Sequence, residues 1–244
     1  MSQSGRSGSV LARLGAVSKF YGERLVLRKI SLEARAAEVL LVAGQNGAGK
    51  STLLKIMAGL IRPDEGEAQR LTPPGAAAYL GHKTFIYGKL TALDNLLFWA
   101  RLHGLADAKN QALGQLARLG LAGQAHDPAG TFSRGMMQRL SLARVFLLNP
   151  RILYLDEPDT GLDLASKAVL RRAVLEAKDQ GLGVVWVSHD PAGDMVHADR
   201  AALLAERGLA YFGPASGFPV CAMPGASGNA PVDAPGVSGS GAAC

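Results

Sequence analysis

The stretch Gly44–Thr52, which reads GQNGAGKST, constrains the fold of this chain more than any other feature of its sequence. It matches the spacing G-x-x-x-x-G-K-[ST] and stands between an apolar run, Val39–Ala43, and a helical pattern, Lys50–Ile61. A glycine-rich loop in this position lets backbone amides converge on phosphate oxygens, helped by the positive end of the helix dipole. The motif predicts an α/β fold in which a buried strand delivers a phosphate-binding loop.

Every residue of this loop is a candidate contact for a nucleotide. Lys50 is expected to reach the β- and γ-phosphates, and Ser51 is expected to offer its hydroxyl to Mg²⁺. A chance glycine-rich turn is the alternative, and the placement between a strand and a helix argues against it. The candidate nucleotide-binding residues are Gly44, Gln45, Asn46, Gly47, Ala48, Gly49, Lys50, Ser51 and Thr52.

Apolar runs and alternating patterns elsewhere predict further strands and helices, including one βαβ unit. A long helical stretch from 91 to 148 contains breaks near Gly104, Gly120 and Asp127-Pro128. The other expected elements are strands at Val10–Lys19, Leu25–Arg35, Val39–Ala43, Ile152–Leu155 and Gly183–Ser188, helices at Lys50–Ile61 and Leu164–Ala177, and a hairpin formed by Ala201–Leu204 and Leu209–Phe212.

Two of the predicted strands end in polar residues that suit nucleotide chemistry. Strand 152–155 runs into Asp156 and Glu157, and the carboxyl ends of strands are where an α/β sheet presents ligand groups. Asp156 is suited to hold Mg²⁺ and Glu157 to accept a proton from an attacking water, with a solvated acidic turn as the alternative. Strand 183–188 leads into His189, which could contact the γ-phosphate or be a structural histidine.

A second helix start has the features of an anion site. Ser133, in the stretch Phe132–Leu140, is a sound N-cap for the helix that precedes the Asp156 strand. A serine hydroxyl and the amide of Gly135 at a helix N-terminus can bind a phosphate. The chain has no second nucleotide loop for this site to serve.

Composition limits the classes of function. The net charge is +6, and the basic residues are scattered, which favours an ordinary solvated surface over a nucleic-acid partner. No run approaches 18 apolar residues and the N-terminus lacks a secretory apolar region, which favours a cytoplasmic protein. Cys221 and Cys244 belong to no metal-binding motif. Residues 1–9 and 214–244 are rich in small residues and are expected to be flexible.

Taken together, the motifs resemble those of the ATP-binding subunits of ABC transporters. The phosphate loop, the signature-like FSRGM, the strand ILYLDEP, the TGLD loop at Thr160–Asp163 and the VSHD segment occur in the order typical of that family. The resemblance covers residues 10–212 and implies a P-loop NTPase with a RecA-like core, an antiparallel β subdomain and a helical subdomain at about 84–142, within one ATP-binding domain at 10–213.

The resemblance also implies roles for single residues. In this family two subunits pair head to tail, so Ser133 and Gly135 would bind ATP held by the partner, which is either a second copy or another ABC ATPase. Asp163 would communicate between the two sites, and His189 would be the switch histidine. Tyr21 would stack on adenine, whereas its sequence alone also allows a core or edge-strand aromatic.

The signature departs from the LSGGQ common in the family. Phe132, Arg134 and Met136 replace Leu, the first Gly and Gln, while Ser133 and Gly135 are kept. Because the two kept residues would supply the phosphate contacts, the site is expected to work. Arg134 adds a cation that could help to hold the γ-phosphate.

The segment Gly81-His82-Lys83 falls where the family has the loop that couples ATP to the membrane partner. By register with the following LTALDNL segment, Lys83 takes the place of a Gln that usually ligates Mg²⁺, and His82 takes that place if the register shifts by one. An ammonium has only donors, so either water completes the metal shell or Lys83 contacts phosphate.

The segment LTALDNLLFWARLHG, at 90–104, is similar to one branch of the family, the ATPase subunit of the haem exporter for cytochrome c maturation. The resemblance implies an ATP hydrolase that uses ATP and Mg²⁺, works with a membrane-embedded permease and sits peripherally on the cytoplasmic face of the inner membrane. The alternatives are another ABC-2-type exporter, of a drug, lipid or polysaccharide, or a soluble ABC ATPase. A P-loop GTPase is disfavoured because no N-K-x-D motif occurs.

Overall fold

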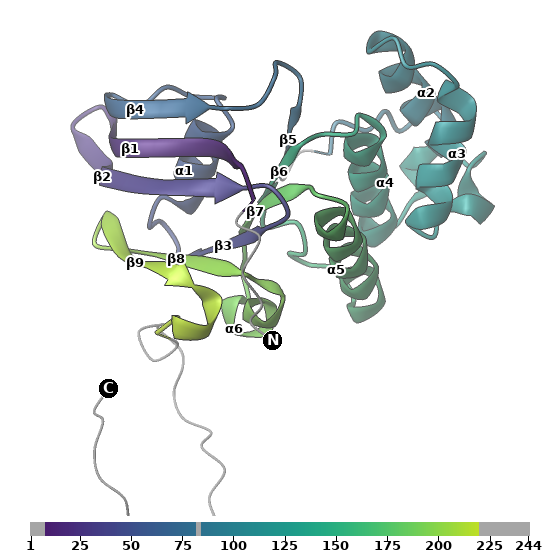
Figure 1. Ribbon diagram of the computed structural model, residues 1–244. Helices are drawn as coiled ribbons and strands as arrows, with labels where there is room; N and C mark the ends of the chain where they lie inside the picture. The colour runs from purple at the N-terminus through teal and green to yellow at the C-terminus, as the bar shows by residue number, and fades with distance from the viewer. Residues whose placement is uncertain (1–7, 82–83, 220–244) are drawn as a thin grey trace, which may run out of the picture.

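The structure is a computed structural model that describes residues 8–81 and 84–219 of the chain. It contains two sheets and a helical region that lies at the end of the molecule opposite the smaller sheet (Figure 1). The larger sheet has the order β5-β6-β7-β3-β8-β9, in which β9 alone runs antiparallel to its neighbour. Its strands are β3 (Val39–Gly44), β5 (Ala77–Leu80), β6 (Ile152–Asp156), β7 (Gly183–Val187), β8 (Arg200–Ala205) and β9 (Gly208–Pro214).

The central strand β3 explains why the phosphate loop lies where it does. It pairs in parallel with β7 on one side and β8 on the other, and its residues from Val39 to Ala43 are buried. Leu40 and Val42 pack toward α1 (Lys50–Met57) and the small sheet, while Leu41 packs toward the long helices. A strand buried on both faces needs apolar residues throughout, which is what the sequence supplies.

The smaller sheet is antiparallel and has the order β2-β1-β4. Its strands are β1 (Val10–Tyr21), β2 (Arg24–Arg35) and β4 (Glu65–Arg70). Strand β4 was not expected from the sequence, because it reads EGEAQR and carries no apolar alternation. It lies at the edge of the sheet, where charged side chains stay in water, so its pairing with β1 and not its composition makes it a strand.

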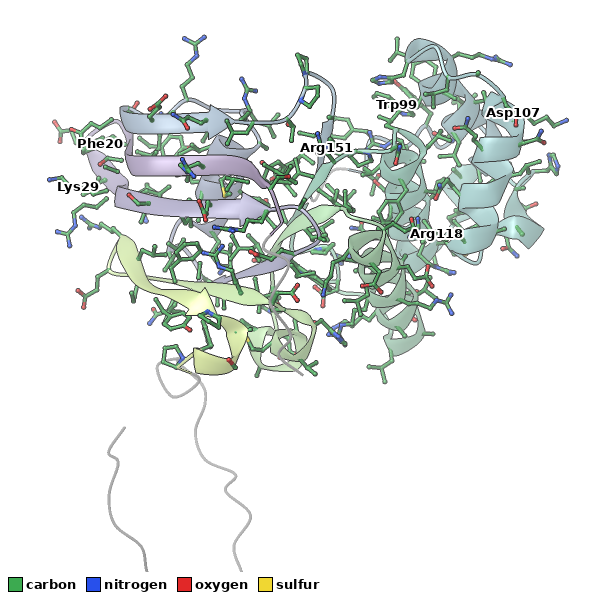
Figure 2. All side chains as sticks on the ribbon, viewed as in Figure 1. Phe20, Lys29, Trp99, Asp107, Arg118 and Arg151 are labelled. Atoms are coloured by element: carbon green, nitrogen blue, oxygen red, sulfur yellow. The ribbon has the colours of Figure 1, made fainter. Side chains whose placement is uncertain are left out.

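The helical stretch expected at 91–148 is confirmed, with its breaks. It contains α2 (Ala92–Leu102), α3 (Ala108–Arg118) and α4 (Arg134–Leu147), followed after β6 by α5 (Leu164–Asp179). Arg118 ties α3 to the rest of the molecule, because its guanidinium lies 4.5 Å from the centre of the Phe146 ring and donates a hydrogen bond to Ala173 O at 2.9 Å. Figure 2 shows Arg118 at this junction and Asp107 farther out on the helical region.

The remaining predicted strands and the helix at 164–177 are confirmed with bounds that differ by at most two residues. Helix α1 is shorter than expected and ends at Met57, since Gly59 adopts a left-handed backbone with φ of 75°. Short helical turns complete the chain: η1 (Ala122–Gln124), η2 (Ala129–Thr131), α6 (Pro191–Asp194), η3 (Met195–His197) and η4 (Ala215–Gly217).

The predicted flexible ends need correction where the structure describes them. Pro214 still belongs to β9, and Phe218 is 7% exposed and packs with Ala43 and Leu203. Apolar contact with the end of β3 therefore orders residues that composition alone assigned to the tail. At the other end, Ser9 O accepts a hydrogen bond from the amide of Ala36. Residues 1–7 and 220–244 of the predicted ends lie outside the described residues.

Within the described part of the chain, no helix is both long and apolar enough to cross a membrane.

Candidate nucleotide site

The phosphate loop has the backbone that anion binding needs. Gly47 and Gly49 have φ of 81° and 98°, in the left-handed region that L residues rarely adopt. A Cβ on Gly49 would lie 2.7 Å from Leu27 Cδ2, so a side chain would also clash. Gly49 is the N-cap of α1 and provides no side-chain acceptor, which leaves the first amides of that helix free to bind phosphate.

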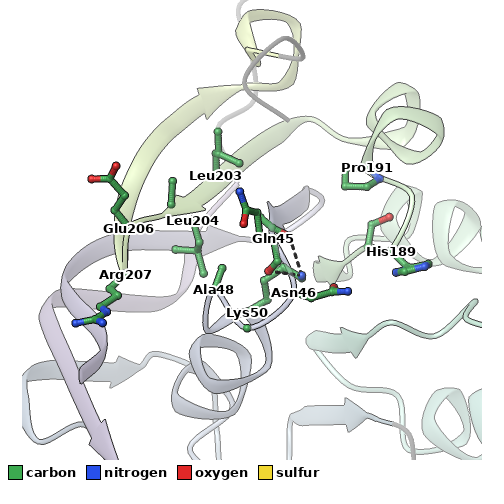
Figure 3. A pocket seen from close by; sticks show the side chains of 14 residues that line it. Gln45, Asn46, Ala48, Lys50, His189, Pro191, Leu203, Leu204, Glu206 and Arg207 are labelled. Carbon is green, nitrogen blue, oxygen red and sulfur yellow. Dashed lines mark hydrogen bonds between the residues drawn. The ribbon is translucent and has the colours of Figure 1, made fainter. Parts of the chain in front are cut away.

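Lys50 is folded back onto the loop. Its Nζ donates to Gly44 O at 2.8 Å and to Gln45 O at 3.2 Å, the second of which is visible in Figure 3. Burial lowers the pKa of Lys50, while the negative charges of Glu157 and Asp156 act in the opposite direction. The ammonium is therefore a poorly solvated cation beside the phosphate cradle, and an anion in that cradle would stabilise it.

Asp156 ends β6 and faces Ser51 across the site. The Ser51 hydroxyl donates to Asp156 Oδ1 at 2.8 Å, and the Tyr79 hydroxyl donates to Asp156 Oδ2 at 2.6 Å. Burial, followed by the bond to Asp156, raises the pKa of Tyr79 well above its usual range. Tyr79 keeps its proton and orients the carboxylate.

Tyr79 is a site residue that sequence reasoning missed. No local signal marked it, because it reaches the site through the pairing of β5 with β6, in which Tyr79 lies opposite Tyr154, two residues before Asp156. Gly81 makes room for it, since a Cβ there would lie 2.7 Å from Tyr79 Cε1.

The oxygen atoms of Ser51 and Asp156 fit a hard divalent cation. Mg²⁺ usually binds one or two carboxylates together with substrate phosphates and water, and it does not need a cage of protein ligands. Among the described residues there is no group of three or more His, Cys, Asp or Glu that could hold a metal. When bound here, Mg²⁺ would be held by these two side chains and would neutralise phosphate charge.

Glu157 follows Asp156 with an unusual backbone. Its φ is 51°, in the left-handed region, and its amide donates to Val187 O at 3.0 Å. It lines a cavity of about 300 Å³ together with Tyr21, Lys50 and Thr52. The strained backbone turns the carboxylate toward the phosphate loop and away from the continuing strand direction.

Tyr21 lies at the end of β1 and is 53% exposed, so it is not a core residue. Its strand is the central one of the small sheet, and it pairs with Arg24 across a tight turn. The Lys19 ammonium lies 5.7 Å from the ring centre. The exposed ring at the mouth of the same cavity is available to stack on a planar base.

His189 follows β7 and is exposed. It lines a larger cavity of about 750 Å³ with Asn46 and Lys50, and Figure 3 shows it across from them. The opposite wall of this cavity comes from the hairpin between β8 and β9, including Glu206 and Arg207. The structure therefore brings together the predicted residues of the phosphate loop, Asp156, Glu157, Tyr21 and His189 along one edge of the two sheets.

The signature residues lie at the start of α4, close to the start of α5. Ser133 Oγ accepts a hydrogen bond from the amide of Met136 at 3.2 Å, which confirms it as the N-cap. Asp163 caps α5 by accepting from the Ser166 amide at 2.7 Å, and this bond lowers the pKa of Asp163. A Cβ on Gly135 would lie 2.3 Å from Ser166 Oγ, so the glycine is required for close contact between the two helices.

Arg134 turns toward its own chain. A Cβ on Gly161 would lie 2.5 Å from Arg134 Nη1, so the guanidinium rests against the glycine of the TGLD loop. Arg134 also shares a cavity of about 270 Å³ with Glu157. Met136 is partly buried and packs against the main core. Within one chain, Arg134 therefore contacts the loop that precedes α5, and Met136 contributes to the core.

His82 and Lys83, the predicted coupling residues, lie outside the described residues. Their described neighbours Gly81 and Thr84 line the same 270 Å³ cavity as Glu157. Gly81 and Thr84 therefore both lie near the catalytic candidate.

Comparison with known proteins places this geometry in a family. The family model described as "ABC transporter" matches residues 27–160. The chain is 36% identical over 181 residues to the cytochrome c biogenesis ATP-binding export protein CcmA of Rhizobium meliloti, a match that covers 70% of this chain and 87% of that protein. It is 30% identical over 184 residues to the linearmycin resistance ATP-binding protein LnrL of Bacillus subtilis, covering 71% of this chain and 59% of that protein.

Comparison with solved structures supports the fold. An ATP-binding subunit of an ABC transporter superposes with a TM-score of 0.75 at 27% identity, covering 84% of this chain and 90% of the other. The ADP conformation of another ATP-binding cassette superposes with a TM-score of 0.74 at 21% identity, covering 84% and 91%, which supports the fold. The chain belongs to the ABC transporter family, and its phosphate loop, paired carboxylates and fold make it one of that family's ATPase subunits.

Proposed function

We propose that this chain is the motor subunit of an exporter that acts in cytochrome c biogenesis, with haem as the cargo. The observation that carries the motor role is the convergence of Lys50, Ser51, Asp156 and Glu157 on one edge of the parallel sheet. The cytochrome c role is supported by relatives of that name that align over most of their length. The cargo is the one implied by the sequence resemblance.

In this proposal ATP binds with its phosphates on the loop at 44–52 and its base on Tyr21. Lys50 leaves the carbonyls of Gly44 and Gln45 and pairs with the β- and γ-phosphates, which relieves its desolvation. Ser51 and Asp156 hold Mg²⁺, and Tyr79 keeps Asp156 oriented. The ion supplies charge neutralisation at the phosphates.

Hydrolysis then depends on two side chains at adjacent strand ends. Glu157 accepts a proton from the attacking water, since its carboxylate opens onto the cavity beside the phosphate loop. His189 contacts the γ-phosphate from the far side of the loop, where it shares a cavity with Lys50. Both residues directly follow strand ends that pair with each other in the sheet, which favours a preorganised site.

A second subunit would complete each site. Ser133 and Gly135 would bind the γ-phosphate of ATP held by the partner, either a second copy of this chain or another ABC ATPase. Asp163 would carry the state of one site to the other, because it caps a helix in direct contact with the signature glycine. Arg134 and Met136 would support this surface by packing.

The proposed membrane partner is a separate permease that meets the helical region, on the cytoplasmic face of the inner membrane. Exposed aromatic residues support this: Tyr87 and Phe98 pack edge to face at 5.2 Å and are 50% and 42% exposed, and Phe85, in the same segment as Tyr87, is 62% exposed. Clustered exposed aromatic residues are typical of protein interfaces. In this proposal His82 and Lys83 couple ATP to the permease, and no nucleic-acid partner is involved.

Glu157→Gln tests the motor role. We expect ATP hydrolysis to be lost while ATP binding is kept, and an ATP-dependent dimer to appear on size-exclusion chromatography with light scattering. Glu67→Gln, at an exposed position on β4, is the matched control and should behave like the parent chain. Full turnover in the Glu157 variant would remove Glu157 from the role of base.

Gene deletion tests the pathway. We expect the deletion strain to lose covalently attached haem in its c-type cytochromes, detected by haem staining of membrane proteins, and the Glu157→Gln gene to fail in restoring it. The similarity to LnrL supports a second candidate, an exporter that confers drug resistance. Normal cytochromes together with new antibiotic sensitivity would favour that candidate.

A further inference from the structure

A cluster of buried charged side chains connects the two loops that carry Glu157 and His189. Asp159 follows Glu157 by two residues, and its side chain is 2% exposed. Asp194 ends α6, the short helix after His189, and its side chain is fully buried. Two carboxylates are rarely buried this deeply without a partner, so their positions need an explanation.

Arg171, on α5, lies between the two carboxylates. Its Nη2 is 2.5 Å from Asp194 Oδ1 and 4.0 Å from Asp159 Oδ2. Lys167, one turn earlier on the same helix, places its Nζ 3.9 Å from Asp159 Oδ2. One guanidinium therefore faces both loops, with the closer contact to the histidine loop.

The histidine loop is fixed to Asp194 on its other oxygen. The Ser188 hydroxyl donates to Asp194 Oδ2 and also accepts from the amide of Asp190 at 2.9 Å. Asp190 in turn caps α6 by accepting from the Gly193 amide at 3.1 Å. Ser188 and Asp190, the two neighbours of His189, are therefore linked to the Asp194 carboxylate through the Ser188 hydroxyl. The same carboxylate is paired with Arg171.

The cluster is poorly satisfied for a structural ion network. Asp159 Oδ1 and Arg171 Nε are buried and make no hydrogen bond, whereas Asp194 Oδ1 is paired with Arg171. Burial raises the pKa of Asp194, which means that its charge is disfavoured there. Buried ion pairs of this kind are often no better for stability than apolar residues of similar size. A positional role accounts for the cluster better than stability does.

We propose that Arg171 is a positioning residue that couples the loop after Glu157 to the loop that carries His189, through Asp159 and Asp194. The proposal rests on the proposed ATPase function of this site. Arg171 lies about two turns along the helix whose first residue is capped by Asp163, so a displacement of that helix start moves the guanidinium with it. The attacking water and the γ-phosphate contact would then be set together by one cation.

Arg171→Met, assayed as ATP hydrolysis by the full chain, is the first test. Arg172→Met is the matched control, because Arg172 is the next residue of α5, is 63% exposed and pairs on the surface with Glu176 at 3.7 Å. We expect kcat to fall by about tenfold to a hundredfold in the Arg171 variant, with KM and Kd for ATP within about twofold of the parent. The control should keep its kcat.

Two further variants separate positioning from folding. Arg171→Lys keeps the positive charge but lacks the planar guanidinium that can bind two acceptors at once. It should therefore recover part of the kcat that is lost in Arg171→Met. The double variant Asp194→Asn and Arg171→Met removes both charges of the closest pair and leaves Asp159 with Lys167, so it should fold with a Tm near that of the parent. It should still hydrolyse ATP slowly, and a parent-like kcat in this folded variant would overturn the proposal.

The outcomes distinguish a failure of the proposed ATPase function from a failure of the proposed positioning role of Arg171. A parent chain that binds ATP but never hydrolyses it, with or without membranes, would overturn the ATPase function and the positioning role with it. An active parent whose kcat is unchanged by Arg171→Met would overturn the positioning role alone. A rise in KM with unchanged kcat would also overturn it, because Arg171 would then act on binding.

Discussion

The N-termini of α1 and α4 make an instructive pair, since each is a candidate phosphate site and the two are built differently. At α1 the N-cap is Gly49, which has no side chain to satisfy the first amides, and Lys50 is held nearby by loop carbonyls. At α4 the N-cap is Ser133, whose oxygen already accepts from the amide of Met136. One helix start is left open for a ligand, and the other is already capped.

The difference teaches which site can bind ATP without help. The α1 site has a cation, a cradle of amides and the side chains of Ser51 and Asp156, all from one chain. At the α4 site, the Ser133 oxygen accepts from a backbone amide, but its hydroxyl proton remains available to a ligand. Gly135, at the same helix start, packs against Ser166. It can add a contact to a nucleotide that is held elsewhere, but it has no cradle of its own.

The largest expected effect is at the open site. Lys50→Met removes a charge-assisted contact worth about 2–3 kcal/mol, so the Kd for ATP should rise by about thirtyfold or more in a fluorescent-nucleotide titration. Because burial lowers the pKa of Lys50, the folded state disfavours its charge at neutral pH, and the Tm should not fall. Lys55→Met, in the last turn of the same helix, is the control. Equal Kd values for the two variants would contradict this account.

An intermediate effect is expected from the glycine at the capped site. Gly135→Ala places a Cβ 2.3 Å from Ser166 Oγ and 3.0 Å from its Cβ, and should destabilise the chain by about 2 kcal/mol in urea unfolding. Gly114→Ala is the matched control, since Gly114 is exposed on α3 with nothing within 4 Å, and it should stabilise by about 0.5–1 kcal/mol. This account would be wrong if both substitutions changed the free energy of unfolding in the same direction.

The smallest effect is expected from the cap itself. Ser133→Ala should cost about 1 kcal/mol of stability, and Ser133→Thr should restore most of it. ATP hydrolysis should fall in the alanine variant, while the Kd of the monomer for ATP stays at the parent value. A loss of binding as large as that of Lys50→Met would show that α4 contributes to the site within one chain, and the distinction between the two helix starts would be wrong.

Much of this arrangement could be predicted from the sequence because its signals are local. The loop at 44–52 specifies its own backbone through glycine, and the strands before Asp156 and His189 are continuous apolar runs. Ser133 was predicted as an N-cap and the structure confirms it, whereas the cap that Asp163 provides for α5 was not predicted.

The features that were missed depend on contacts distant in sequence. Strand β4 is a strand because β1 pairs with it, and Tyr79 belongs to the site because β5 lies beside β6. The cluster around Arg171 joins three segments, each of which reads as an ordinary helix or loop. Phe218 is ordered by apolar contact with Ala43, Ala201 and Leu203 of the larger sheet. No local pattern reports such pairings, since they are specified by the fold as a whole.

The position of β3 in the larger sheet has a consequence for how the protein is made. Val39 pairs with Val184 on one side, and Leu40 pairs with Arg200 on the other. The strand that delivers the phosphate loop is thus synthesised before both of its neighbours and cannot complete its pairing until β7 and β8 have left the ribosome. Such distant parallel pairing slows folding, so we expect nucleotide binding only after β8 is available.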